Sequence, residues 1–185
     1  MVYPGAMPTF FPSLAALETF LRSLHTLSCP VCGAGGTYKR HGYIRGFVSV
    51  LQHGIRAWRI YCNPRRGGCG RAPSLRLAES LHHRCMDAGL LAAFLSALLR
   101  GLSTKAAWEA SGCRLSLDRA YHLLGLLRRG LPALRARLAA RSPPPAPTPL
   151  TTTPLLQTLQ HLLAAFTASP VHAFQLHFQS PFLSP

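Results

Sequence analysis

The sequence predicts an α+β protein in which a small β region precedes a mostly helical one, and two observations carry that prediction. Residues from about 28 to 77 are rich in Gly, Arg, Cys and aromatic residues, a composition typical of short strands and turns. Residues from about 85 to 141 are rich in Ala, Leu and Arg, which favours helices. Because 48% of the 185 residues are apolar, the chain is not an ordinary disordered basic tail.

The net charge is strongly positive and unevenly distributed. Lys and Arg total 20 against 5 Asp and Glu, and no acid lies between Thr19 and Ala78. Such a surplus favours an anionic partner, either nucleic acid or an acidic membrane surface. So few carboxylates argue against an enzyme built on acidic clusters, and we expect neither catalysis nor a small-molecule substrate. Residues 142–185 hold no Lys, Arg, Asp or Glu, so the basic body lies within residues 22–141.

Neither end of the chain predicts a membrane or export segment. The apolar runs are broken well before the roughly 18 residues that a membrane span needs, and residues 1–11 lack the basic start of a secretory signal. We therefore expect a cytoplasmic protein with reduced cysteines and no membrane partner. In a reducing compartment, spaced cysteines are more often metal ligands than disulfides.

Four cysteines predict a structural metal site. Cys29 and Cys32 form a C-x2-C knuckle, and Gly33 after it lets the backbone turn without a Cβ clash. Cys62 and Cys69 form a second pair with the longer spacing C-x6-C, across a stretch whose Asn-Pro and Gly-Gly steps favour turns. Four protein ligands leave no open coordination position, so we expect one structural Zn²⁺. Reduced cysteines without a metal are the alternative.

Two strands are expected between the cysteine pairs. Residues 37–43 and 55–61 have the aromatic and β-branched content of strands. Knuckle, hairpin, second knuckle and a final strand together predict a zinc ribbon over residues 25–80. Its core would be too small to fold alone, so metal binding would supply much of the folding free energy.

The remaining cysteines and nearby histidines have weaker claims on a metal. Cys85 and Cys113 lie in or beside apolar helical stretches, which favours small buried side chains. Residues 82–85 contain two His and Cys85, and a metal site there is an alternative interpretation. That site would lack a matching second pair of ligands. His41 and His53 lie within the expected ribbon and are alternative ligands to the cysteines.

Helices are expected before and after the ribbon. Residues 1–24 contain one, over 12–24, with Ser13 as its N-cap. Residues 81–141 contain further helices at 87–99, 103–111, 116–129 (ending at Gly130) and 132–141. A short helix, a glycine turn and a longer helix are typical of a helix-turn-helix with residues 116–129 as the recognition helix. A helical hairpin with a solvated basic face is the alternative.

The C-terminal part is uncharged and rich in proline. Residues 142–154 predict an extended linker, and residues 155–185 an apolar tail with a helix at 155–168 and a strand at 174–178. Its large apolar side chains need a cover, supplied either by the chain's own helices or by a partner. These side chains are Phe174, Leu176, Phe178 and Phe182.

The basic residues are the candidate DNA contacts. In the ribbon they are Lys39, Arg40, Arg45, Arg56, Arg59, Arg65, Arg66 and Arg71. In the helices they are Arg114, Arg119, His122, Arg128 and Arg129. Arg and Lys would neutralise phosphates. The aromatic residues of the ribbon either form its core or stack on bases of a single strand; they are Tyr38, Tyr43, Trp58 and Tyr61.

Four segments carry a family resemblance: CPVCG, RHGYIRG, RIYCNPRRGGCGRA and GLSTKAAWEASG. Over about residues 25–141 the chain resembles the zinc-ribbon and helix-turn-helix portion of bacterial insertion-sequence transposases, and the short stand-alone proteins found with such elements. The resemblance implies DNA docking at element ends and a transposase subunit as a further partner. It also implies Cys29, Cys32, Cys62 and Cys69 as zinc ligands.

The chain departs from that family in lacking a nuclease core. Strand transfer of the acidic-triad type needs three carboxylates that hold two metal ions, and five scattered acids show no such convergence. We therefore expect a zinc-stabilised, non-catalytic DNA-binding protein. The alternatives are an accessory protein-interaction module and a non-functional remnant of a transposase gene.

Overall fold

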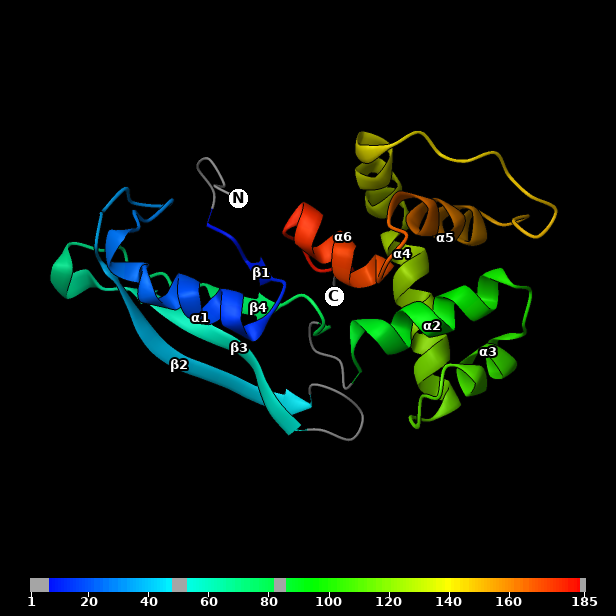
Figure 1. The fold of residues 1–185 in the computed structure, drawn as a ribbon, viewed down its shortest axis with the longest axis horizontal. Helices are drawn as coiled ribbons and strands as arrows, with labels where there is room; N and C mark the ends of the chain where they lie inside the picture. The colour runs from blue at the N-terminus through cyan, green and yellow to red at the C-terminus, as the bar shows by residue number, and fades with distance from the viewer. Residues whose placement is uncertain (1–6, 48–52, 82–85, 184–185) are drawn as a thin grey trace.

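The computed structural model describes residues 7–47, 53–81 and 86–183, which form a sheet and a group of helices side by side (Figure 1). We name the described residues up to 80 the sheet region and those from 81 onward the helical region. With 48% helix and 17% strand, the fold class is α+β, as expected.

The sheet region is built on four strands in the order β1-β4-β3-β2. The strands are β1 (Phe10–Phe11), β2 (Tyr38–Phe47), β3 (His53–Cys62) and β4 (Ser74–Leu77). β2 and β3 confirm the expected strands and pair antiparallel, as do β3 and β4, whereas β1 runs parallel to β4. β4 confirms the strand expected after the second knuckle. β1 was not expected from the sequence, because it is two residues long and is defined only by its pairing.

One helix covers one face of this sheet. The helix α1 (Leu14–Arg22) begins as expected at Ser13, whose side chain accepts a hydrogen bond from the Ala16 N–H. Leu17 and Leu21 on its inner side are buried against the sheet. The short 3-10 turn η1 (Leu24–Thr26) then brings the chain to the first cysteine pair.

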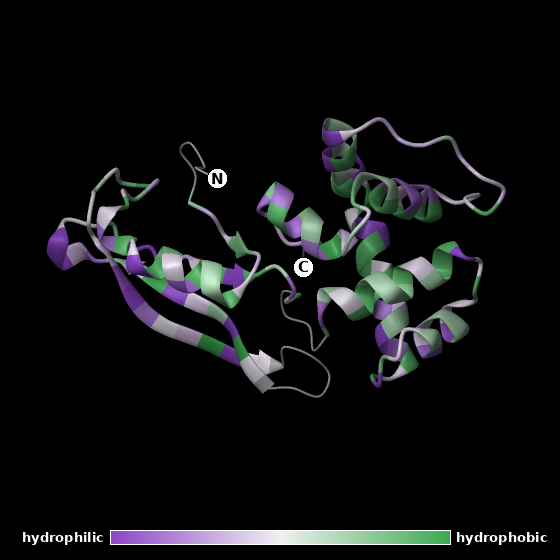
Figure 2. Ribbon diagram, in the orientation of Figure 1, coloured by the Kyte–Doolittle hydropathy of each residue, from purple (hydrophilic) through white to green (hydrophobic). Residues whose placement is uncertain are grey.

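The helical region contains five helices, α2 (Ala88–Leu99), α3 (Thr104–Ala110), α4 (Leu117–Arg141), α5 (Pro154–Ala165) and α6 (Pro170–Phe178). The first two confirm the expectation, with Asp87 and Ser103 as N-caps. α2 is apolar on nearly every side, as Figure 2 shows, because α3, α5 and α6 all pack around it. Phe94 lies edge-on against Trp108, with ring centroids 5.0 Å apart.

The expected end of a helix at Gly130 is wrong. α4 continues through Gly130 and Pro132 to Arg141 as a single helix. The reason is that its apolar stripe does not stop at the glycine, since Leu127, Leu134 and Leu138 are all buried. Packing of that stripe outweighs the backbone hydrogen bond that the proline lacks.

The expected strand at 174–178 is also wrong, because these residues belong to α6. Phe174 and Phe178 fit a helical spacing as well as a strand spacing, and Val171 extends the helical pattern. The tail is therefore covered by the chain itself, since Phe174 and Phe182 are buried in the core of the helical region. Residues 142–153 before it form neither helix nor strand, as expected of a linker.

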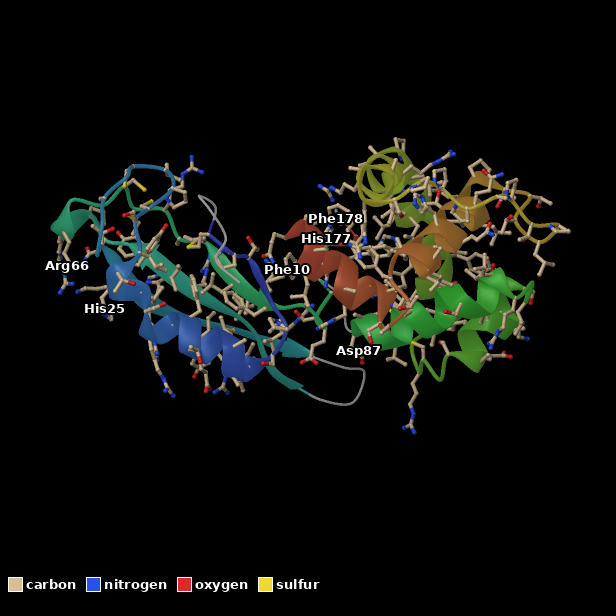
Figure 3. All side chains as sticks on the ribbon, turned by 45° about the horizontal axis from the view of Figure 1, so that its top comes forward. Phe10, His25, Arg66, Asp87, His177 and Phe178 are labelled. Atoms are coloured by element: carbon tan, nitrogen blue, oxygen red, sulfur yellow. The ribbon has the colours of Figure 1, made fainter. Side chains whose placement is uncertain are left out.

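α6 joins the two regions through two glutamines. The buried Gln175 donates to the carbonyls of Ala78 (2.6 Å) and Ser80 (3.3 Å). Gln179 accepts from the backbone N–H groups of Thr9 and Phe10, each at 2.8 Å. Figure 3 labels Phe10 at this junction. Among the described residues, no helix has the length and apolar character needed to cross a bilayer.

Candidate metal centre

The four cysteines expected to bind metal lie together at one end of the sheet region. Their Sγ atoms all lie within 4.8 Å of one another. The Sγ of Cys29 lies 3.8 Å from that of Cys69, and the Sγ of Cys32 lies 3.7 Å from that of Cys62. Sulfurs bound tetrahedrally at a Zn–S distance of about 2.3 Å would be about 3.8 Å apart. The four cysteines could therefore hold one metal ion, and their sulfurs are too far apart for disulfides.

The first cysteine pair forms a tight turn held by two backbone hydrogen bonds. The N–H of Gly33 donates to the Cys29 carbonyl (2.8 Å), and the N–H of Cys29 donates to the Ala34 carbonyl (2.9 Å). Gly33 has a φ of +73°, which a side chain would disfavour, as expected from its position after the knuckle.

The second pair has the same backbone frame in spite of its longer spacing. The N–H of Gly70 donates to the Cys62 carbonyl (2.9 Å), and the N–H of Cys62 donates to the Arg71 carbonyl (2.9 Å). Gly70 has a φ of +79°, close to that of Gly33. The two knuckles are thus equivalent in backbone geometry. The signal for this equivalence in the sequence is the glycine that directly follows the second cysteine of each pair. For Gly70 this signal was missed.

The four extra residues of the second knuckle are absorbed by a short 3-10 turn, η2 (Pro64–Arg66). Asn63 caps it, since its side chain accepts from the Arg65 N–H at 3.1 Å. Gly68 must be glycine, because a Cβ there would lie 2.6 Å from the Cys62 Sγ and 2.8 Å from the Asn63 carbonyl oxygen. The turn folds back far enough for the Cys69 N–H to donate to the Cys62 Sγ at 3.3 Å.

Polar groups around the sulfurs favour thiolates. The Thr37 hydroxyl lies 3.2 Å from the Cys62 Sγ. Burial acts to raise the pKa of Cys29, but hydrogen bonds from the Tyr38 hydroxyl and from backbone N–H groups of the knuckle outweigh it and lower the pKa to about 6. No local pattern predicts these two hydroxyl partners, because their contacts depend on the sheet register.

The crowding of four sulfurs has the opposite effect on the last thiol to ionise. The backbone N–H of Ala34 acts to lower the pKa of Cys32, but desolvation and the three neighbouring cysteines outweigh it and raise the pKa to about 11. Four thiolates at these distances therefore need a cation among them. Cys29 and Cys62 are buried and Cys32 and Cys69 are exposed, so the site lies at the surface of the region.

Nearly all of the candidate DNA contacts are exposed. The exposed residues are Lys39, Arg40, Arg45, Arg59, Arg65, Arg66, Arg71, Arg114, Arg119, His122, Arg128 and Arg129. Arg66 marks the η2 loop, at the end of the sheet region far from the helical region (Figure 3). Arg56 differs, because it is half-buried and its guanidinium donates to the Leu81 carbonyl. That contact gives Arg56 a role in joining the two regions.

The alternative ligands lie outside the cluster or outside the described residues. His41 is exposed on β2 and is absent from the group of four cysteines. The side chain of His53 and residues 82–85, including Cys85, lie outside the described part of the structure. Cys113 is half-buried and packs against the helical core, as expected of a small apolar side chain.

The aromatic residues of the sheet region divide by exposure. Tyr38 is buried and Trp58 half-buried, and both belong to the core that α1 covers. Tyr43 is 50% exposed. Tyr61 is half-buried, and its ring lies 5.4 Å from that of His41.

The expected recognition helix follows a longer turn than a helix-turn-helix uses. Six residues, 111–116, separate α3 from α4, and Gly112 among them has a φ of +71°. A helix-turn-helix has a turn of 3–4 residues. The turn is nevertheless fixed, because the Trp108 indole donates to the Leu115 carbonyl at 2.8 Å. Arg119 and His122 are exposed on the first turns of α4.

Comparisons with known proteins give no relative. No protein-family model, curated protein or solved structure matches the chain.

Proposed function

We propose that the chain is a zinc-stabilised DNA-binding protein without a catalytic core, associated with a transposable element. The association rests on the resemblance of four segments to transposase-associated proteins: CPVCG, RHGYIRG, RIYCNPRRGGCGRA and GLSTKAAWEASG.

Zinc is the metal that best fits the ligand set. Four cysteine sulfurs at tetrahedral separations are typical of structural zinc sites, and no ligand position is left open for a substrate. The ion would also supply the positive charge that four thiolates need. Its role would therefore be to hold the two knuckles and the sheet together.

The observation that carries the DNA partner is the charge around the cluster. The segment from Thr19 to Ala78 has ten basic residues and no acid. A zinc ion with four thiolates has a net charge of −2, which leaves this region strongly basic. The exposed Arg65, Arg66 and Arg71 surround the second knuckle, where they suit phosphate contacts.

Helix α4 is the second element suited to DNA. It carries exposed Arg119, His122, Arg128 and Arg129 with a single acid, Asp118, in the same stretch. A protein-interaction module was the rival hypothesis because of the apolar tail. Burial of Phe174 and Phe182 in the chain's own core removes that motive.

The test is binding of the zinc-loaded chain to labelled duplex DNA at rising salt. We expect affinity to fall about tenfold or more between low and physiological ionic strength, because phosphate contacts release counterions. Arg65→Gln with Arg66→Gln should weaken binding. Arg100→Gln with Arg135→Gln removes the same charge at two other exposed positions and should have a smaller effect. Equal loss from both pairs, or salt-independent binding, would contradict the proposal, and no binding at all would favour a non-functional remnant.

A further inference from the structure

The two faces of the β2–β3 hairpin differ sharply. The strand register pairs Tyr38 with Cys62 and Tyr43 with Trp58, which places these residues on the face that α1 covers. It pairs Lys39 with Tyr61, and alternation along β3 places Arg59 on the same side as Tyr61. This second side of the hairpin we name the outer face.

The outer face is basic, aromatic and low in relief. Lys39, His41 and Arg59 are exposed on it, and the rings of His41 and Tyr61 lie 5.4 Å apart. The neighbours of Arg59 across the sheet are the small residues Gly42 and Ser74. A Cβ added to Gly42 would meet no other atom within 4 Å. The long side chains of the outer face therefore project from a surface of small residues.

The covered part of this side of the sheet lies toward the β1 edge, away from β2. There Phe10 on β1 is buried where Gln179 of α6 binds its backbone, and Ala57 on β3 is almost fully buried. Figure 1 shows α6 beside β1 and α1 running along the strands. The turn η1 packs against β2, and its Leu24 belongs to the core on the α1 side, whereas α6 packs against β1.

Charge and ring chemistry together indicate the occupant. The cations match phosphates, and no acid lies within the whole segment from Thr19 to Ala78 to oppose them. A tyrosine on the face of a sheet offers a stacking surface, as in sheets that bind single strands. Bases within a duplex are already stacked on each other, so only an unpaired base can use that surface.

We propose that the outer face binds a single-stranded polynucleotide, with a base stacked on Tyr61 and the phosphates contacting Lys39 and Arg59. The inference rests on the proposed nucleic-acid function and narrows its partner. His41 would support one edge of the Tyr61 ring. The site adjoins the second knuckle, because Tyr61 directly precedes the metal ligand Cys62, so loss of the metal would also disturb the face.

The test compares affinities of the zinc-loaded full chain for labelled oligo(dT), oligo(U) and a duplex, by fluorescence anisotropy. Oligonucleotides of about 12 nucleotides fit the site sizes of such surfaces. Tyr61→Leu should weaken single-strand binding roughly 5- to 150-fold, the effect of losing one stacked base, and Tyr61→Phe should restore it. Tyr43→Leu is the matched control, because it removes an exposed tyrosine from the other face of the same hairpin. It should leave single-strand binding unchanged.

A second pair of variants keeps the test valid if Tyr61→Leu loses its metal. Lys39→Glu on the outer face should weaken oligo(dT) binding more than Arg40→Glu, whose exposed side chain belongs to the opposite face. The oligo(dT) and oligo(U) arms identify which kind of strand is preferred, and Tyr61 dependence with either supports the proposal. Equal losses from the two faces would overturn it.

Failure of this inference is distinguishable from failure of the proposed function. Salt-sensitive duplex binding without single-strand binding would overturn the single-strand site and leave DNA binding intact. Absence of binding to duplex and single strand alike would overturn both.

Discussion

The sheet region and the helical region are held together by different means. Among the described residues, the core of the sheet region has ten buried side chains, and two of these are the candidate metal ligands Cys29 and Cys62. The helical region buries twenty-four, drawn from all five of its helices. A core as small as the first does not stabilise a region by apolar burial alone. We therefore expect the sheet region to depend on a bound metal ion, while the helical region depends on packing.

The two regions are nevertheless linked by α6, which is the last helix along the chain. Its Gln175 and Gln179 bind backbone groups of β1 and of the segment after β4. A helix from the uncharged tail thus positions the basic sheet against the basic helices. The uncharged tail therefore packs as part of the same structure as the basic regions.

The largest expected effect comes from loss of the metal, which should affect the sheet region and not the helical region. Cys62→Ser should abolish binding of one metal ion and unfold the sheet region, while the helical region keeps most of its helix. Structural zinc contributes about 10–16 kcal/mol in small zinc-binding peptides, more than the sheet region could replace. Metal analysis and hydrogen exchange, region by region, measure this.

Cys113→Ser is the control for that variant, because Cys113 is half-buried outside the metal cluster. It should keep the metal and both regions. A folded sheet region in metal-free Cys62→Ser protein would refute metal dependence.

The next largest expected effect comes from a change in the core of the helical region, which should leave the metal site intact. Phe94→Ala removes a fully buried ring that packs on Trp108 in the helical core. We expect a loss of about 3–5 kcal/mol in the free energy of unfolding of the helical region, from lost burial and the cavity that remains. Metal affinity, measured by competition with a chelator, should not change. A Phe94→Ala protein that loses its metal as readily as its helices would show that the two cores form one unit.

A smaller effect tests the link between the regions. Gln175→Leu removes the donor to the Ala78 and Ser80 carbonyls and the acceptor for the Phe182 N–H, all of them buried. We expect a loss of about 1–3 kcal/mol and less cooperative unfolding, because buried partners are left unsatisfied. Gln160→Leu, which removes only an exposed bond to the Ala146 carbonyl, should change neither. Equal effects of the two variants would rule out Gln175 as the link.

The smallest effect is a pH dependence of the helical region. Burial and the neighbouring Arg141 lower the pKa of His177, whose Nδ1 lies 3.1 Å from the Arg141 guanidinium. Protonation therefore favours the unfolded chain, and the free energy of unfolding should fall as the pH drops through the ordinary histidine pKa of about 6.5. His177→Gln should flatten this part of the pH profile. Identical profiles for the two proteins would contradict the assignment.

The parts of the fold that the sequence predicted are those with local signals. The C-x2-C-Gly knuckle, the strand composition around Tyr38 and Tyr61, and the caps at Ser13 and Ser103 each act within a few residues. They could be interpreted without knowing what lies across the sheet. The four cysteines followed from the same local spacing.

The parts that were missed depend on distant partners. β1 is two residues long and is held by β4 and by Gln179, about 170 positions away along the chain. α4 continues past Gly130 because other helices cover its apolar stripe. α6 forms because Phe174 packs into the core of the helical region. The Thr37 and Tyr38 contacts to sulfur follow from strand register. None of these partners is visible in a local window.

X-ray absorption at the zinc edge tests the central claim, metal dependence through four cysteines, most directly. For the purified full chain we predict one zinc per molecule, with a first shell of four sulfurs at about 2.3 Å. A shell containing nitrogen or oxygen, or a folded sheet region without stoichiometric metal, would contradict the account.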